Sequence, residues 1–186
     1  MSNTIHLIIG STRQNRLGAD IAAWVEEQAA KNPTINLQVI DLLAENLPAF
    51  DAPVPPAYAP SQTEHGKAWA AKIAKTDRLI FLTPEYNRSM PSSLKNALDY
   101  LVDEWKGKPA AIVSYGYIDG GQKAAAHLSD VLGWLKLNLL AGSIHLHIKP
   151  DMMTPTGSFA DITTAFAEYE KPLHEALRTL IDTQPK

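Results

Sequence analysis

A short turn near the N-terminus concentrates groups that bind anions. It runs Gly10-Ser-Thr-Arg-Gln-Asn-Arg-Leu-Gly18 and holds Arg13 and Arg16, two of only five arginines in the chain. The turn follows a predicted strand and opens a predicted helix. The free N–H groups and the positive dipole end of that helix start can bind an anion, together with the hydroxyl groups of Ser11 and Thr12. The dinucleotide pattern G-x-G-x-x-G and the P-loop pattern G-K-[ST] are both absent. The turn therefore predicts a site for one compact phosphate, the alternative being a helix start with two solvated arginines.

Two further loops carry flat and flexible groups. The loop after the third predicted strand contains Pro84, Tyr86 and Asn87. The Tyr86 ring offers a face for stacking, and the Asn87 amide offers both donors and an acceptor. The loop after the fourth strand, 114–121, has three glycines that let the backbone approach a planar ligand closely. Taken alone, the loop at 83–91 is explained equally well as a capped turn with an exposed tyrosine. The loop at 114–121 is by itself a weak signal, because glycine-rich turns between a strand and a helix are common.

Alternating apolar runs and helical patterns must position these three loops. Strands are predicted at 5–9, 37–40, 79–83, 110–114 and within 139–146, where Gly142 interrupts the run. Helices are predicted at 18–30, 64–75, 91–103 and 122–136, with a proline-rich loop at 44–62 and a C-terminal helical pattern kinked or broken at Pro172. This alternation predicts an α/β fold, a three-layer sandwich around a parallel sheet. Ligands of such sheets bind beyond the carboxyl ends of the strands, where the three loops lie.

Composition narrows the classes of function. The 186 residues predict one domain, 1–186, and the formal net charge of −3 argues against a broad nucleic-acid-binding face. The sequence contains no cysteine, which excludes disulfides, thiolate metal sites and a cysteine nucleophile. No apolar run approaches the ~20 residues that span a bilayer, and no signal peptide is visible. We therefore expect a cytoplasmic protein without membrane insertion.

Together the loops resemble the NADPH-dependent FMN reductase family of flavodoxin-like proteins. Gly-Ser-Thr-Arg-x-x-Arg-x-Gly at 10–18 is similar to the family's phosphate loop, and Pro-Glu-Tyr-Asn-x-x-x-Pro-x-x-Leu-Lys-Asn-Ala-Leu-Asp at 84–99 is similar to its most recognisable signature. The resemblance covers roughly residues 4–145. It implies a five-stranded sheet in the order 2-1-3-4-5 and one FMN per chain. It also implies a homodimer or homotetramer with the helix at 91–103 in the interface, where Trp105 is either a contact or a core residue.

The resemblance also implies roles for individual residues. The phosphate loop would contribute Ser11, Arg13, Arg16 and Gly18. The isoalloxazine and ribityl side would contact Pro84, Glu85, Tyr86 and Asn87. The third flavin-contacting loop would supply Ser114, Gly116, Gly120 and Gly121. NADPH or NADH would pass hydride to the flavin, which then reduces a small acceptor such as a flavin, quinone, azo compound or metal chelate, so no catalytic side chain is expected. Arg88 is a candidate contact for the extra phosphate of NADPH, or a solvated loop arginine, and Tyr117 either stacks on substrate or is structural.

The main alternative is an FMN-binding electron carrier of the flavodoxin type, without pyridine-nucleotide oxidase activity of its own. Such carriers usually have a strongly acidic docking surface and a phosphate loop without arginines. The modest charge of this chain, together with Arg13 and Arg16, favours the reductase.

Other chemistry finds less support in the residues. A hydrolytic triad of Ser114, His127 and Asp130 lacks the G-x-S-x-G elbow. His145 and His147 fall on one face of a strand but have no nearby carboxylate, so no metal site is predicted. Asp41, after the second strand, is interpreted as a strand-end or turn acid.

Overall fold

A computed structural model describes residues 4–184, which form one sheet flanked by helices. The strands are β1 (Thr4–Ile9), β2 (Asn36–Asp41), β3 (Leu79–Pro84), β4 (Pro109–Gly116), β5 (Asn138–Leu139) and β6 (Ile144–His147). The α-helices are α1 (Gly18–Ala30), α2 (Leu42–Glu45), α3 (Glu64–Ala74), α4 (Ser92–Asp99), α5 (Gln122–Trp134), α6 (Ile162–Ala165) and α7 (Glu170–Asp182). Short 3₁₀ helices occur at Pro150–Met152 and Ala167–Tyr169.

The sheet is parallel and has the strand order expected from the family resemblance. Its order is β2-β1-β3-β4-β5, with β6 also paired to β4. The register sets Ile9 beside Leu82 and Leu82 beside Val113. Because these strands end at one level, the loops after β1, β3 and β4 emerge together at the carboxyl edge.

The predicted fifth strand is in fact two short strands along the same neighbour. β5 pairs with β4 at Pro109 and Ala110, whereas β6 pairs with Val113 to Gly116. Residues 140–143 separate them, and Gly142 has a φ of +80°, a left-handed conformation that side chains disfavour. The sheet therefore has six strands, and the glycine that interrupts the apolar run marks the break.

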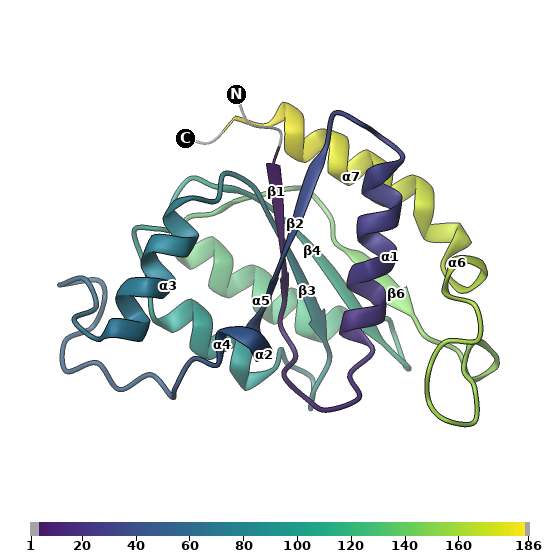
Figure 1. The fold of residues 1–186 in the computed structure, drawn as a ribbon, viewed down its shortest axis with the longest axis horizontal. Helices are drawn as coiled ribbons and strands as arrows, with labels where there is room; N and C mark the ends of the chain where they lie inside the picture. Colours follow the sequence, from purple (N-terminus) through teal and green to yellow (C-terminus); the bar gives the residue numbers. More distant parts are fainter. Residues whose placement is uncertain (1–3, 185–186) are drawn as a thin grey trace.

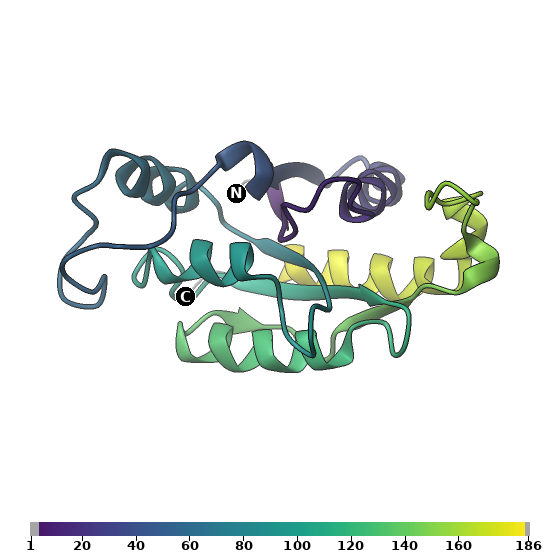
Figure 2. The same ribbon diagram turned by 90° about the horizontal axis from the view of Figure 1, so that it is seen from below.

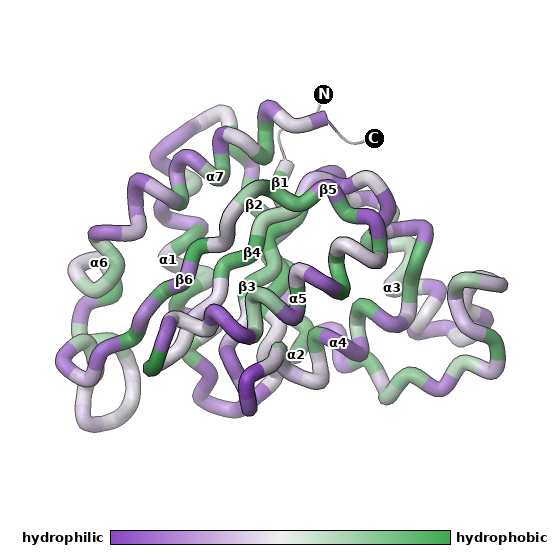
Figure 3. Tube along the Cα trace, turned by 180° about the vertical axis from the view of Figure 1, so that it is seen from behind, coloured by the Kyte–Doolittle hydropathy of each residue, from purple (hydrophilic) through white to green (hydrophobic). Residues whose placement is uncertain are grey.

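Two apolar cores cover the two faces of the sheet. Figure 1 shows α1 and α7 on one side of the twisted sheet and α3, α4 and α5 on the other. Side chains of successive strand residues point alternately into one core and the other. In β1, Leu7 packs under α1 and α7, and Ile8 packs under the helices on the opposite face. The hydropathy trace in Figure 3 accordingly shows the most apolar segments along the central strands. This is the predicted three-layer sandwich.

The helix after the second loop is shorter than predicted, because the chain turns back under it. The expected helix at 91–103 begins after Pro91 and ends at Asp99. The Leu98 carbonyl accepts from the Leu101 N–H at 3.3 Å and from the Trp105 indole N–H at 3.3 Å. Trp105 has no exposed surface and packs in the core under α4. Trp105 is therefore a core residue. Its hydrogen bond to the Leu98 carbonyl lies at the end of α4, four residues before the predicted end at 103.

Three smaller differences concern helix ends. The predicted loop at 44–62 is entered by the short helix α2, whose N-cap is Asp41. The helix predicted at 122–136 ends at Trp134. In the C-terminal pattern the break lies at Phe166–Tyr169, before Pro172, which occupies the first turn of α7. Proline there loses no helical hydrogen bond.

The last helix is fixed to the sheet by a buried arginine. Arg78, just before β3, is 2% exposed; its Nε donates to the Leu180 carbonyl at 2.7 Å and its Nη2 to the Ile181 carbonyl at 3.1 Å. These carbonyls lie in the last turn of α7, where cations are favoured. Figure 2 shows α7 along the sheet, with the loop before α3 extending at one end of the molecule and α6 at the other. No helix within residues 4–184 is long and apolar enough to cross a membrane.

Candidate functional site

The three loops predicted to carry chemistry enclose one pocket at the carboxyl edge of the sheet. Its volume is about 460 Å³, within the range of small-molecule sites. The lining residues are Arg13, Leu17, Pro84, Glu85, Tyr86, Asn87, Arg88, Tyr115, Gly116, Tyr117, Ile118, Asp119, Gly121 and Ile148. The fold thus brings together the loops that the sequence only suggested as separate features.

The first loop presents anion donors at the start of α1. Ser11 is fully buried, and its hydroxyl accepts from the Arg13 N–H at 3.4 Å. The N-cap residue of α1, Leu17, has an apolar side chain and makes no side-chain capping hydrogen bond. The Gly18 backbone hydrogen-bonds with Tyr115, whereas the N–H groups that follow it in the first turn can reach an external acceptor. The exposed Arg13 lies beside them on the pocket wall.

Tyr86 joins the first loop to the second. Its hydroxyl lies 2.7 Å from the Ser11 hydroxyl, across 75 residues of sequence. The Tyr86 ring is 36% exposed and lines the pocket. The tyrosine predicted as a ring-side residue therefore also fixes the loop that carries the anion donors.

Arg16 is largely engaged by an acid from the neighbouring strand. Its Nη2 forms an ion pair with Asp41, whose other oxygen accepts from the Leu43 N–H at 3.0 Å and so caps α2. The buried Nε of Arg16 has no hydrogen-bond partner within residues 4–184. Asp41 is thus the turn acid that the sequence indicated, and the Nε of Arg16 remains a buried donor without a partner among the described residues.

Gly18 is required by the packing of a tyrosine. A Cβ at this position would lie 2.8 Å from the Tyr115 hydroxyl, which also hydrogen-bonds with the Gly18 backbone. Burial raises the pKa of Tyr115 well above its ordinary value. Gly18 therefore lets the neutral Tyr115 hydroxyl support the start of α1 from below.

The second loop ends in a strained two-residue hairpin. Tyr86 and Ser89 exchange backbone hydrogen bonds of 2.8 and 3.0 Å, and between them Asn87 and Arg88 have φ values of +50° and +68°. Two successive left-handed residues define a type I′ turn, whose second central position favours glycine. An arginine there costs roughly 1 kcal/mol of backbone strain.

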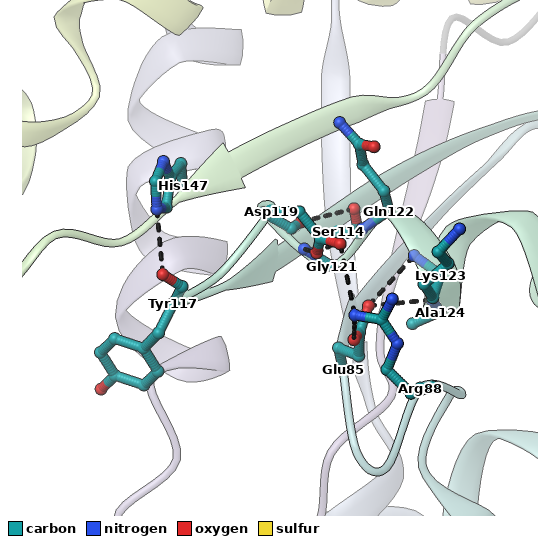
Figure 4. A network of polar contacts seen from close by, with 11 residues as sticks. Glu85, Arg88, Ser114, Tyr117, Asp119, Gly121, Gln122, Lys123, Ala124 and His147 are labelled. Atoms are coloured by element: carbon teal, nitrogen blue, oxygen red, sulfur yellow. Dashed lines mark hydrogen bonds and ion pairs between the residues drawn. The ribbon is translucent and has the colours of Figure 1, made fainter.

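The Glu85 carboxylate serves a helix. Its Oε2 accepts from the Lys123 N–H at 3.0 Å and the Ala124 N–H at 3.3 Å, so it caps the N-terminus of α5 (Figure 4). Its Oε1 lies 3.4 Å from Arg88, which also lies 3.6 Å from Asp119. Glu85 lines the pocket as expected, but its side chain ties the second loop to α5 and, through Arg88, to the third loop.

The third loop is held by two histidines of β6 that sequence reasoning did not place in the site. The Ser114 hydroxyl donates to the Gly120 carbonyl at 2.8 Å, so it must accept from His145 Nδ1, also at 2.8 Å. His147 Nε2 donates to the Tyr117 carbonyl at 2.9 Å, as Figure 4 shows. Burial lowers the pKa of His145, and the nearby Asp119 opposes that shift. The available signal in the sequence was that His145 and His147 lie on the same face of a strand, a pattern considered only as a weak indication of a metal site.

The glycines of the third loop bring backbone segments together. Gly120 and Gly121 have φ values of +66° and +82°, and a Cβ on Gly121 would lie 2.9 Å from the Tyr115 carbonyl. A Cβ on Gly116 would lie 3.2 Å from the Gly121 nitrogen. Gly116 and Gly121 line the pocket, whereas Gly120 packs against His145 behind it. Ser114 is likewise a support of the loop.

The hydrolytic triad is not assembled. Ser114 bonds with His145, whereas His127 Nδ1 lies 2.7 Å from the Ser89 hydroxyl. Among the residues placed by the structure, no group of three potential metal ligands occurs.

Comparisons with known proteins agree with this architecture. A family model described as NADPH-dependent FMN reductase matches residues 3–150. An NAD(P)H-dependent FMN reductase from a Nectria species is 45% identical over 134 residues, 69% of this chain and 66% of that protein. One from Schizosaccharomyces pombe is 42% identical, over 73% of this chain and 68% of its own. The chain thus spans about two thirds of the length of these two relatives.

Two further matches have other names and cover more of this chain. A 2-hydroxy-1,4-benzoquinone reductase from a Burkholderia species is 32% identical over 81% of both chains. Among solved structures, the flavoenzyme NAD(P)H:(acceptor) oxidoreductase of Paracoccus denitrificans superposes with a TM-score of 0.77 at 24% identity, covering 98% of this chain and 99% of its own. The structural match extends the shared fold through the C-terminal helices that the family model leaves out.

Proposed function

This chain belongs to the NADPH-dependent FMN reductase family, and we propose that it is an FMN-dependent NAD(P)H oxidoreductase that reduces a small acceptor. The observation that carries the proposal is the start of α1, which has no capping side chain on its N-cap residue Leu17 and lies beside Arg13, at one side of a pocket walled by Tyr86 and Tyr117. Such a pocket offers an anion site and a flat apolar site at once. We further propose that residues 1–186 form one FMN-binding domain.

The residues present fit the phosphate of FMN. The N–H groups that follow Gly18 in the first turn of α1, the hydroxyl side chains of the first loop and Arg13 form a donor set suited to a phosphate monoester. The unpartnered Nε of Arg16 supplies one more donor. We assign Ser11, Arg13 and Arg16 to this end, with Gly18 shaping the loop.

The other end of the pocket fits a planar ring. Pro84, Tyr86 and Asn87 come from one side and Gly116 and Gly121 from the other, with Gly120 behind them completing the turn. The close approach of Gly116 to Gly121 leaves backbone, with no side chain, toward the ring. We assign these residues to the flavin ring and ribityl chain, while Glu85 and Ser114 hold the two loops in place.

The flavin, when bound, supplies two-electron redox chemistry that none of the side chains lining the pocket can perform. The chain orients the co-substrate and acceptor against it. Tyr117 and Ile118, 60% and 79% exposed, form an apolar rim on which a nicotinamide or a flat acceptor can pack. A quinone is one flat acceptor that this rim could accommodate, and two relatives are named 2-hydroxy-1,4-benzoquinone reductase and quinone reductase.

We further propose a homodimer or homotetramer in the cytoplasm, where reduced nicotinamide nucleotides are available. The apolar stripe of α4 is buried in the chain's own core, so an interface on this helix would use its partly exposed polar face. Exposed Trp134 and Tyr58, at 83% and 85%, are further candidates for a contact. Light scattering at micromolar concentration tests this, and a monomer mass contradicts it.

The function is tested on the purified protein with added FMN. We expect tight, saturable FMN binding in a fluorescence titration and steady NADPH or NADH oxidation when a quinone is supplied. NADPH loss only after a separate reductase is added would support the electron carrier of flavodoxin type. Protein that does not bind FMN would overturn the assignment.

A further inference from the structure

Arg88 occupies a backbone position that suits another residue. It is the second central residue of the Tyr86–Ser89 turn, with a φ of +68°, where glycine is free of strain. Left-handed strain in a side-chain-bearing residue often marks a place where that side chain has a use. The question is what use the guanidinium has.

The contacts of Arg88 do not account for its presence. Its Nη1 lies 3.4 Å from Glu85 and 3.6 Å from Asp119, and the side chain remains 56% exposed. Ion pairs this long and this exposed stabilise a fold very little. Glu85 already has better donors in the two N–H groups of α5. The two carboxylates thus hold the guanidinium at the rim while leaving much of it open to solvent.

The pocket has two arginines with different surroundings. Arg13 lies at the start of α1, where the proposed function places the phosphate of FMN. Arg88 lines the same pocket from the second loop, beside Asp119 and the apolar rim formed by Tyr117 and Ile118. A cation at the mouth, separate from the first anion site, suits a second anion that arrives with the substrate.

We propose that Arg88 binds a phosphate of the reduced nicotinamide nucleotide and thereby selects this electron donor. The inference rests on the proposed function. The phosphate is either the 2′-phosphate of NADPH or the pyrophosphate that NADPH and NADH share. In both cases the guanidinium exchanges its long contacts with Glu85 and Asp119 for shorter, charge-assisted bonds to phosphate oxygens.

The test compares Arg88→Gln with Arg88→Lys, which carry similar backbone strain and differ in charge. Arg88→Gly relieves the strain and serves as a third variant that the turn accommodates. KM and kcat are measured at saturating FMN with NADPH, with NADH and with N-benzyl-1,4-dihydronicotinamide, a donor without phosphate. The expected result is a KM increase in R88Q and R88G about tenfold larger for phosphate-bearing donors than for the phosphate-free one. R88K should recover part of the loss.

The pattern among donors identifies the phosphate. A selective loss for NADPH assigns the 2′-phosphate, and an equal loss for NADPH and NADH assigns the pyrophosphate. Titration of the FMN-loaded protein with 2′,5′-ADP and with ADP should show the same ranking without turnover.

Two results would overturn the inference. KM values that are unchanged with all three donors exclude a phosphate contact, and equal increases with all three indicate a purely structural role. A wild-type protein that binds FMN but oxidises neither NADPH nor NADH refutes the proposed function itself. The two failures are therefore distinguishable.

Discussion

Removal of the Glu85 carboxylate distinguishes two possible roles of this side chain, a cap of helix α5 and a contact to the flavin. Glu85→Ala deletes two hydrogen bonds to the first N–H groups of α5 and a weak ion pair with Arg88. Loss of a cap costs about 1 kcal/mol, loss of the charge–dipole interaction about 0.5 kcal/mol, and loss of the exposed pair a few tenths at most. The free energy of unfolding should therefore fall by roughly 1.5–2 kcal/mol, which for 186 residues lowers Tm by about 3–8 °C.

The assay is thermal and urea unfolding of the FMN-free protein, followed by circular dichroism. Glu85→Gln keeps an acceptor oxygen and loses the charge, so it should show about half the effect. Glu26→Ala, an exposed glutamate on α1, is the matched control and should change stability by less than ~0.5 kcal/mol. If Glu85→Ala unfolds like wild type while its FMN affinity collapses, the carboxylate contacts the flavin and the capping argument is wrong.

Three other changes test the supports of the pocket. Arg13→Ala should weaken FMN binding about 10- to 100-fold through loss of an arginine–phosphate contact, and an unchanged dissociation constant in a fluorescence titration would remove Arg13 from the phosphate site. Gly18→Ala should destabilise the chain by about 1–3 kcal/mol, because its Cβ would lie 2.8 Å from the Tyr115 hydroxyl; adding Tyr115→Phe should restore most of the loss in denaturant unfolding, and no restoration would exclude the clash as its cause. Burial lowers the pKa of His145 below its ordinary 6.5, so its neutral form favours the fold above pH 6.5 and that contribution is lost as pH falls below it. His145→Gln should therefore lose less stability than wild type between about pH 8 and about pH 5, and equal losses would contradict this linkage.

Local patterns were sufficient to predict most of the fold. The helix at 18–30 has the predicted bounds, and the strand before it begins one residue earlier than predicted. Both could be predicted because a buried apolar run ends at Gly10 and an amphipathic pattern follows it. The strand order came from the family resemblance, and the register confirms it. In these places a residue's neighbours in sequence are enough to decide its conformation.

The differences arise where a distant residue decides the outcome. The end of α4 depends on Trp105 folding back to the Leu98 carbonyl, which the apolar stripe at 94–102 does not show. The last strand is split because the turn at Gly142 interrupts its pairing with β4, so that β5 pairs with the start of β4 and β6 with its end. Apolar periodicity reports burial, and it does not report where a hydrogen-bond ladder stops.

The candidate site shows the same division. The three loops were predicted to meet, and they do, because parallel strands bring their carboxyl ends to one edge. The individual side chains were harder to predict: Glu85 caps a helix that starts 37 residues later, and His145 and His147 reach the third loop from β6. Such contacts depend on side-chain direction across the sheet, which sequence spacing alone does not encode.

The division of the outer strand also shortens one of the two free edges of the sheet, the one opposite β2. A long, straight border strand offers a continuous row of unpaired backbone groups, which can template edge-to-edge aggregation. Here that border consists of pieces of two and four residues, separated by the bend at Gly142. A variant that straightened residues 140–143 into one strand would be expected to fold and yet become prone to fibril formation.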